Sequence, residues 1–140
     1  MIELFIHEVI HGLFALPFAV FLYKKTRSIK SVVILFLVTY LMDLDHLIDY
    51  FIYFGSRFEL REFLSGIYFH ESGRAFVFFH GWEYFVLFLY LAHRNKRRWK
   101  SVFTAASLGM LPHLIWDSVN VGTPVVYFIL YRASKLFFIF

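Results

Sequence analysis

The chain contains no cysteine. Disulfide bonds and thiolate metal sites are therefore excluded, and cysteine usage gives no indication of the cellular compartment. Charged residues are also scarce, because only 17% of the 140 residues are Asp, Glu, Lys or Arg, against about a quarter in a typical soluble domain. No internal repeat or low-complexity tract is present, and the length predicts one domain over residues 1–140.

Apolar and aromatic residues take the place of the missing charges. Hydrophobic residues make up 60% of the chain, with 20 Phe, 9 Tyr and 3 Trp, and the mean hydropathy is +0.65. A net charge of +4 would suit nucleic acid, but the basic residues form two short runs between apolar segments. Such runs are typical of loops beside a membrane, so we expect a membrane protein with lipid as its environment and no nucleic-acid partner.

Four apolar stretches are each long enough to cross a bilayer, which takes about 20 helical residues. They run from about Leu4 to Tyr23, Ser31 to Phe54, Ala75 to Ala92 and Val102 to Val121. The predicted fold is therefore all-α: a polytopic membrane bundle of four spans, with interfacial amphipathic helices beside it.

Two basic loops predict the orientation of the bundle. They contain Lys24, Lys25, Arg27 and Lys30, and Arg94, Lys96, Arg97, Arg98 and Lys100. Because positively charged loops stay in the cytoplasm, we expect the N-terminus and residues 55–74 to lie outside. The first span lacks a preceding basic region, which favours an N-out anchor over a cleaved signal peptide.

Two segments outside the spans are expected at the outer interface. Residues 55–74 carry apolar residues at helical spacing, namely Leu60, Phe63, Leu64, Ile67 and Tyr68. This pattern favours a short amphipathic helix over a plain loop. The tail after Pro124 is apolar except for Arg132 and Lys135. A fifth span would bury both cations, so we expect an interfacial helix or a partial re-entry instead.

The expected spans carry many ionisable side chains. These are His7, Glu8 and His11, then Asp43, Asp45, His46 and Asp49, then His80 and Glu83, and finally His113 and Asp117. The predicted orientation places all of them near the outer ends of their helices. Ionisable residues inside a membrane are costly and usually functional, so this common depth indicates a shared site.

The spacing of these residues is that of metal ligands. His7 and His11 are four residues apart, as are His113 and Asp117, so each pair shares a helix face. Imidazole with carboxylate suits Zn²⁺, and also Mn²⁺ or Fe²⁺. There are more candidates than one zinc needs, which predicts two ions, or one ion with hydrogen-bonded supporting groups. The alternative is a polar core that only joins helices through hydrogen bonds.

The order of the motifs resembles the membrane-bound metal-dependent hydrolase family typified by the YdjM protein. That family has an early His before a span, a D-x-D-H motif, a central His motif, and H-x-x-x-D followed by Gly and Pro. The matching segments here are HGLFALPFAVF with His11, Asp43-Leu44-Asp45-His46, FFHGWEY with His80, and LPHLIWDSVNVGTP with His113, Asp117, Gly122 and Pro124. The resemblance covers residues 11–124.

The resemblance implies a hydrolase, since family members are described by analogy with zinc-dependent phospholipase C. It implies a phosphoesterase that acts on a lipid or lipid-linked phosphate at the outer face of a bacterial or archaeal plasma membrane. The implied first ligands are His11, Asp45, His46, His80, His113 and Asp117, with Asp43 and Glu83 next. The family's central motif has two His, whereas this chain has His80 alone and Ala75 at the other position; Glu83 is the candidate replacement.

Further roles follow from this hypothesis. Glu8 or Asp49 would act as general base. Arg57, Arg61 or Arg74 in the outer connection would meet a phosphate, with the connection as a lid. The same arginines are equally placed to pair with the neighbouring glutamates.

Three other functions remain open at the level of sequence. His7-Glu8-Val9-Ile10-His11 matches the H-E-x-x-H motif of zinc peptidases, which would make the protein an intramembrane protease. Carboxylate–His pairs at helical spacing also hold iron in di-iron oxidoreductases. A metal-ion transporter or binding protein would place its ligands near mid-membrane. A homo-oligomer is compatible with each reading.

Overall fold

The computed structural model describes residues 2–138, and helices joined by short loops make up most of this part of the chain. The elements are α1 (Ile2–Thr26), α2 (Ile29–Leu41), the 3₁₀ turn η1 (Met42–Asp45), α3 (His46–Phe54), α4 (Leu60–Ser65), α5 (Ile67–Ser72), α6 (Trp82–Arg94), α7 (Arg97–Val121), the 3₁₀ turn η2 (Pro124–Tyr127) and α8 (Ile129–Ser134). Among residues 2–138, the one strand-like pairing is a bridge between Arg74 and Phe138. The predicted all-α class is confirmed.

Helix α7 is the centre of the bundle and packs against α1, α2 and α6. Small residues permit this close packing: a Cβ at Gly109 would collide with the backbone carbonyl of Leu35 on α2. Thr39 on α2 uses the closeness, because its hydroxyl donates to the Gly109 carbonyl at 3.1 Å. Small residues at helix contacts and hydroxyl bonds between helices are typical of packing in membranes.

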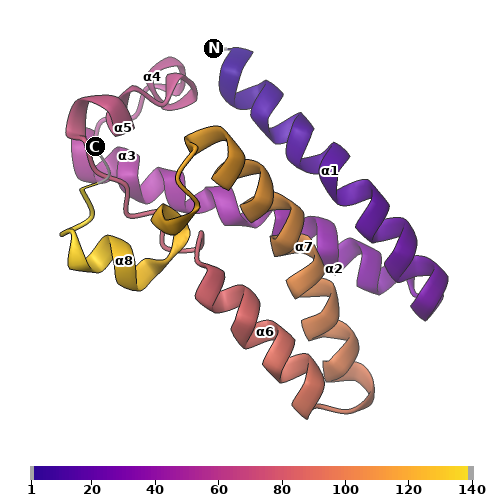
Figure 1. Cartoon of the computed structure of the whole chain (residues 1–140). Helices are drawn as coiled ribbons and strands as arrows, with labels where there is room; N and C mark the ends of the chain where they lie inside the picture. Colours follow the sequence, from indigo (N-terminus) through magenta and orange to yellow (C-terminus); the bar gives the residue numbers. More distant parts are fainter. Residues whose placement is uncertain (1, 139–140) are drawn as a thin grey trace.

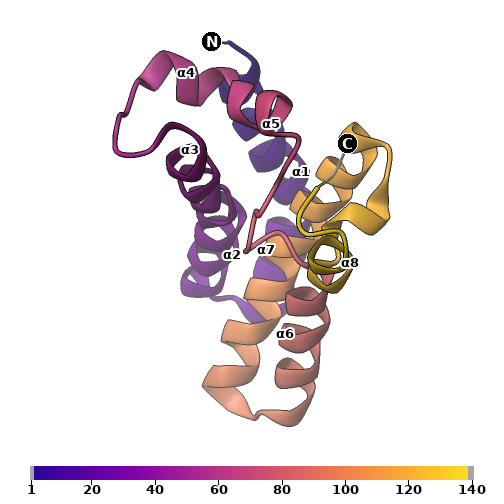
Figure 2. The same cartoon turned by 90° about the vertical axis from the view of Figure 1, so that its left-hand side faces the viewer.

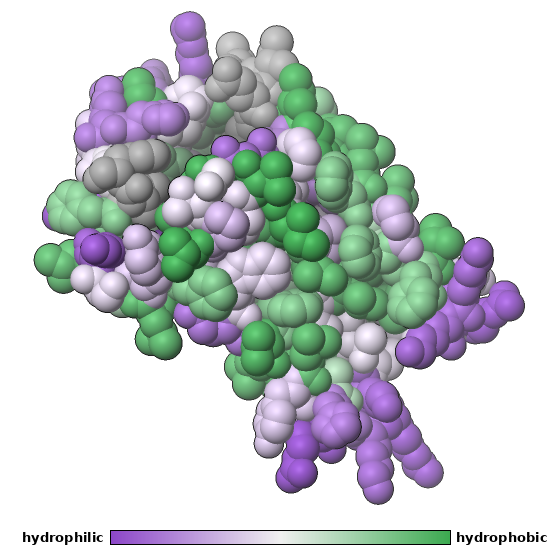
Figure 3. All heavy atoms as spheres, in the orientation of Figure 1, coloured by the Kyte–Doolittle hydropathy of each residue, from purple (hydrophilic) through white to green (hydrophobic). Residues whose placement is uncertain are grey.

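The two ends of the bundle differ in chemistry. The α1–α2 and α6–α7 turns lie at one end, while the chain termini and α4, α5 and α8 lie toward the other (Figures 1 and 2). Hydrophilic residues gather at both turns, and hydrophobic surface covers much of the visible face between the two ends (Figure 3). The basic loops identified in the sequence therefore share one end of the molecule.

Two helical segments are long and apolar enough to cross a membrane. They are Phe5–Thr26 and the continuous run Ile29–Phe54 formed by α2, η1 and α3; only 28% and 33% of their apolar windows are buried in the molecule. Large apolar side chains such as Phe21 and Leu37 point outward, with 55% and 52% of their surface exposed. Both expected spans in the first half of the chain are thus present as helices.

The second half differs from the expectation of two further spans. Residues 75–81 are not helical and include a turn at Phe78–Phe79, so the third helix starts at Trp82 rather than at Ala75. Helix α6 has 13 residues and is about 20 Å long, short of the roughly 30 Å hydrocarbon layer. Helix α7 has 25 residues, which is long enough, but it is less apolar than the first two. The four-span architecture therefore remains a prediction.

The outer connection and the C-terminal segment also depart in detail. Two short helices, α4 and α5, replace the single predicted amphipathic helix, because Gly66 breaks the helix in a left-handed conformation with φ of 66°. In the C-terminal segment, Arg132 is completely buried. The expected interfacial helix or partial re-entry stays a prediction, because Arg132 is buried within the protein itself, while Lys135 is exposed.

Candidate metal centre

The local structure of four separate segments aims their polar side chains at one place. Helix α1 presents His7 and His11 on one face. The tight 3₁₀ turn η1 has three residues per turn, so Asp43 and the residue three positions later, His46, point the same way. His80 comes from the non-helical segment before α6, and α7 contributes two more candidates, His113 and Asp117.

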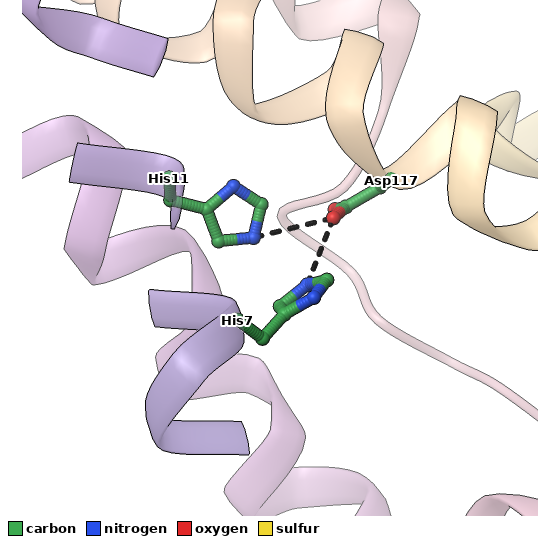
Figure 4. Close-up of side chains that lie close together, drawn as sticks. All are labelled: His7, His11 and Asp117. Atoms are coloured by element: carbon green, nitrogen blue, oxygen red, sulfur yellow. Dashed lines mark hydrogen bonds and ion pairs between the residues drawn. The ribbon is translucent and has the colours of Figure 1, made fainter. Parts of the chain in front are cut away.

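One group of donors surrounds the first oxygen of the Asp117 carboxylate. The Nε2 atoms of His7 and His11 lie 3.1 and 3.2 Å from Asp117 Oδ1, and Figure 4 shows the three side chains pointing toward one another. The His11 ring is fully buried, and its other nitrogen, Nδ1, has no hydrogen-bond partner within residues 2–138. His7 has a second partner, because Trp116 Nε1 donates to His7 Nδ1 at 3.4 Å.

A second group faces the other oxygen of the same carboxylate. Asp117 Oδ2 lies 3.2 Å from His113 Nε2 and 3.4 Å from His80 Nε2, and these two Nε2 atoms are 3.0 Å apart. Asp43 Oδ1 lies 3.2 Å from His80 Nε2, and 3.5 Å from the Nε2 atoms of both His46 and His113. Asp117 therefore stands between two groups of donors.

These spacings fit coordination of a metal ion. Donors held about 2.0–2.1 Å from a tetrahedral zinc lie roughly 3.3 Å from one another, and the Nε2–Oδ distances given above run from 3.1 to 3.5 Å. A hydrogen-bonded polar core would pair its buried atoms, yet His11 Nδ1 and Asp43 Oδ2 have no hydrogen-bond partner among the described residues. The donor set therefore suits divalent metal.

Asp45 lies behind His80 rather than beside the converging atoms. Its Oδ2 accepts the Phe79 backbone N–H at 2.6 Å and lies 3.1 Å from His80 Nδ1. A carboxylate on the far nitrogen of a ligating histidine fixes the ring and its tautomer. The structure thus gives Asp45 a supporting position, whereas the sequence placed it among the direct ligands, and brings Asp43 forward instead.

Asp49 and Glu83 are engaged in backbone contacts. Both oxygens of Asp49 accept N–H groups, from Phe76 at 2.6 Å and Val77 at 2.9 Å, which leaves this carboxylate poorly placed to act as general base. Glu83 Oε1 accepts the Leu130 N–H at 3.1 Å and so ties α6 to α8. Glu83 lies outside the donor groups of the described chain.

Two of the three arginines of the outer connection contact other side chains, and the third is exposed. Arg57 forms ion pairs with Glu59 at 3.3 Å and Glu62 at 2.5 Å. The Arg74 guanidinium lies 4.1 Å from the centre of the Phe138 ring, and Arg61 is exposed on α4. Within residues 2–138, none of the three forms an ion pair with a candidate ligand, so phosphate binding by them stays a prediction.

Arg132 is a functional residue that sequence reasoning missed. Its guanidinium donates to three backbone carbonyls: Val77 at 3.0 Å, His80 at 3.0 Å and Val126 at 2.7 Å. Burial lowers the pKa of this guanidinium from its ordinary value. The only signal in the sequence was a cation in an otherwise apolar tail. Arg132 fixes the segment that carries His80.

A cavity opens directly onto the donors. Its volume is about 230 Å³, and its wall includes His7, His46, His80 and Asp117 together with apolar residues such as Val126. A substrate in this cavity would reach both groups of donors.

No family model matches this chain, and neither the curated proteins nor the solved structures include a match. The resemblance described from the sequence therefore stays a prediction.

The metal content of purified variants tests the centre. We expect about two equivalents of divalent metal per chain, about one in His11→Ala, and almost none in Asp117→Ala, because Asp117 faces both groups. Elemental analysis measures this directly, with the exposed His93→Ala as a control that keeps its metal. Full metal content in both Asp117→Ala and His113→Ala would mean that the cluster is only a polar core.

The Arg132 contacts predict an indirect effect on the centre. Arg132→Lys loses the three-way bonding and should weaken metal binding about 10–100-fold, the usual cost of disturbing a group that orients a ligand. Competitive titration with a chelator measures the affinity, and Lys135→Ala, an exposed cation three residues on, is the matched control. Equal affinities in all three proteins would contradict a positioning role.

Proposed function

We propose that this protein is an integral membrane metal-dependent hydrolase of the phosphoesterase type. The observation that carries the proposal is the position of Asp117, whose two oxygens face different pairs of histidines. One carboxylate between two donor sets is the arrangement expected of a two-metal hydrolytic site. Its likeness in motif order to the YdjM-type hydrolases supports the same reading.

We place the site near the outer face of the membrane, with α1, α2–α3, α6 and α7 as the four crossings. Both basic turns lie at one end of the bundle (Figure 3), in keeping with a cytoplasmic position. The third crossing would consist of α6 and the non-helical residues 75–81. Non-helical backbone is tolerated at membrane depth where protein groups satisfy it, and Asp45, Asp49 and Arg132 do so here.

Cysteine labelling tests this orientation, because the natural chain has no cysteine. In intact cells, a membrane-impermeant maleimide should label Ser56→Cys, which follows α3 at the outer end. Lys96→Cys, in the α6–α7 turn, should react only after the cells are permeabilised. The opposite pattern would contradict the outward-facing site.

The chemistry divides between the metal and the chain. Bound divalent metal would lower the pKa of a water and neutralise phosphoryl oxygens. The chain holds the donors rigidly: His80 is oriented by Asp45, and the backbone around it by Arg132. Glu8 is half-buried and lines a groove together with Asp43 and His46. Since Asp49 is occupied by backbone N–H groups, Glu8 is the carboxylate we assign to holding the proton taken from water.

Replacing this carboxylate tests the assignment. Glu8→Gln keeps the shape of the side chain but cannot take a proton, so turnover should fall by about 10²–10⁴-fold, while metal content stays unchanged. Hydrolysis of para-nitrophenyl phosphate by the metal-loaded protein gives the rate. Glu59→Gln, on the exposed outer connection, is the control. An unchanged rate in Glu8→Gln would remove Glu8 from the mechanism.

A zinc protease is the second candidate, because one observation favours it. His7, His11 and the distant Asp117 meet as a three-donor group, which is what H-E-x-x-H plus a later carboxylate would require. Such an enzyme would hold one zinc, cleave a membrane peptide and lose all activity in Glu8→Gln. It would have no use for the second group of donors at His80 and His113, which is why we rank it behind the phosphoesterase.

A further inference from the structure

A second cavity borders the metal centre from the side of the bundle. It lies where α1, η1 and the start of α3 meet α4, and its volume is about 330 Å³. Its apolar wall consists of Phe5, Tyr40, Leu44, Leu47, Phe63 and Leu64, and its polar lining of Glu8, Asp43 and His46. We call this cavity the lateral groove.

The outer edge of the lateral groove is exposed, and its polar end is formed by candidate ligands. Phe5, Tyr40 and Leu44 expose 67%, 43% and 50% of their surface, so the rim is open to whatever surrounds the bundle. His46 lines the lateral groove and also the 230 Å³ cavity over the donors. The two spaces therefore adjoin at one candidate ligand.

We propose that the lateral groove holds the hydrocarbon chain of a single-chain amphiphilic phosphate ester, whose phosphate lies at the metal centre. This inference rests on the proposed function and names its substrate class. Apolar walls that end at Asp43 and His46 match a molecule with an apolar tail and a metal-binding head. At 330 Å³ the groove is at the small end of ligand pockets, which favours one chain over two.

Another apolar cavity among the described residues does not compete for this role. It measures about 340 Å³ and lies between α2, α6 and α7, lined by residues such as Val38, Phe88 and Met110. None of the candidate ligands lines it within the described chain. A chain in that cavity would have no head group at the metal centre.

The reaction at this site is simple hydrolysis. Water adds to phosphorus, the bond between phosphorus and the alkyl oxygen breaks, and the long-chain alcohol leaves with one proton. Water is the only co-reactant, and the other product is inorganic phosphate. The alcohol would depart by the route its chain occupies, along α1 and α4.

Binding of alkyl phosphonates tests the groove without relying on catalysis. Dodecylphosphonate and butylphosphonate have the same head group and resist this hydrolysis, because carbon is bonded directly to phosphorus. Calorimetry on the protein in bilayer nanodiscs should show at least tenfold tighter binding of the dodecyl compound. Each buried methylene contributes up to about fourfold in affinity, and partition of the probe into lipid offsets part of this gain.

Substitutions that fill the groove provide the decisive comparison. Leu64 lies on α4, which carries none of the candidate ligands. Leu64→Trp should weaken dodecylphosphonate binding at least tenfold while butylphosphonate binding changes less than twofold. Leu37→Trp on α2 is the matched control, since Leu37 is 52% exposed and does not line the groove. Equal dodecylphosphonate binding by Leu64→Trp and Leu37→Trp would overturn the proposal.

Activity separates failure of the groove from failure of the function. If metal-loaded protein hydrolyses butyl phosphate and dodecyl phosphate equally well, and Leu64→Trp slows neither, the phosphoesterase stands and the groove proposal is overturned. If chain-dependent binding is lost in Leu64→Trp but no phosphate ester is hydrolysed, the groove stands and the phosphoesterase is overturned.

Discussion

The buried carboxylate of Asp117 is the constraint on which the rest of the site depends. An ionised carboxylate away from water is costly unless cations or hydrogen bonds compensate it, and its ion-pair partners within residues 2–138 are all histidines. Because the carboxylate sits on α7, the helix that contacts α1, α2 and α6, those histidines can come from several segments at once. The donors can therefore assemble around Asp117 because α7 is the central helix of the bundle.

A second constraint follows from the non-helical segment that carries His80. Asp45 and Asp49 accept three of its N–H groups, and Arg132 donates to its carbonyls at Val77 and His80. An unsatisfied backbone group costs several kcal/mol in hydrocarbon. The two carboxylates and the Arg132 guanidinium therefore make hydrogen bonds to the backbone of this segment that a helix would otherwise make within itself. Two of the acidic residues that the sequence offers as ligand or base therefore serve the backbone.

What the sequence could predict depends on the range of the interaction. The spacing of His7 with His11, and of His113 with Asp117, is local and identifies candidates that the structure brings together. The exchange of roles between Asp43 and Asp45 depends on a 3₁₀ turn of four residues, which hydrophobic periodicity does not reveal. Arg132 acts on a segment more than fifty residues earlier, and no pattern along a single chain encodes such a pairing.

The geometry of the donors is also the reason that we favour a phosphoesterase over a protease with a single zinc. The H-E-x-x-H donors use only one oxygen of Asp117, so a single zinc there would leave the opposite oxygen facing His80 and His113, with Asp43 beside them. That second set is buried, and its donors could hold an ion of their own. The lateral groove also reaches the centre through Asp43 and His46, on the side of this second set. A reaction that uses both sets and the groove accounts for more of the molecule than one that uses His7, His11 and Asp117 alone.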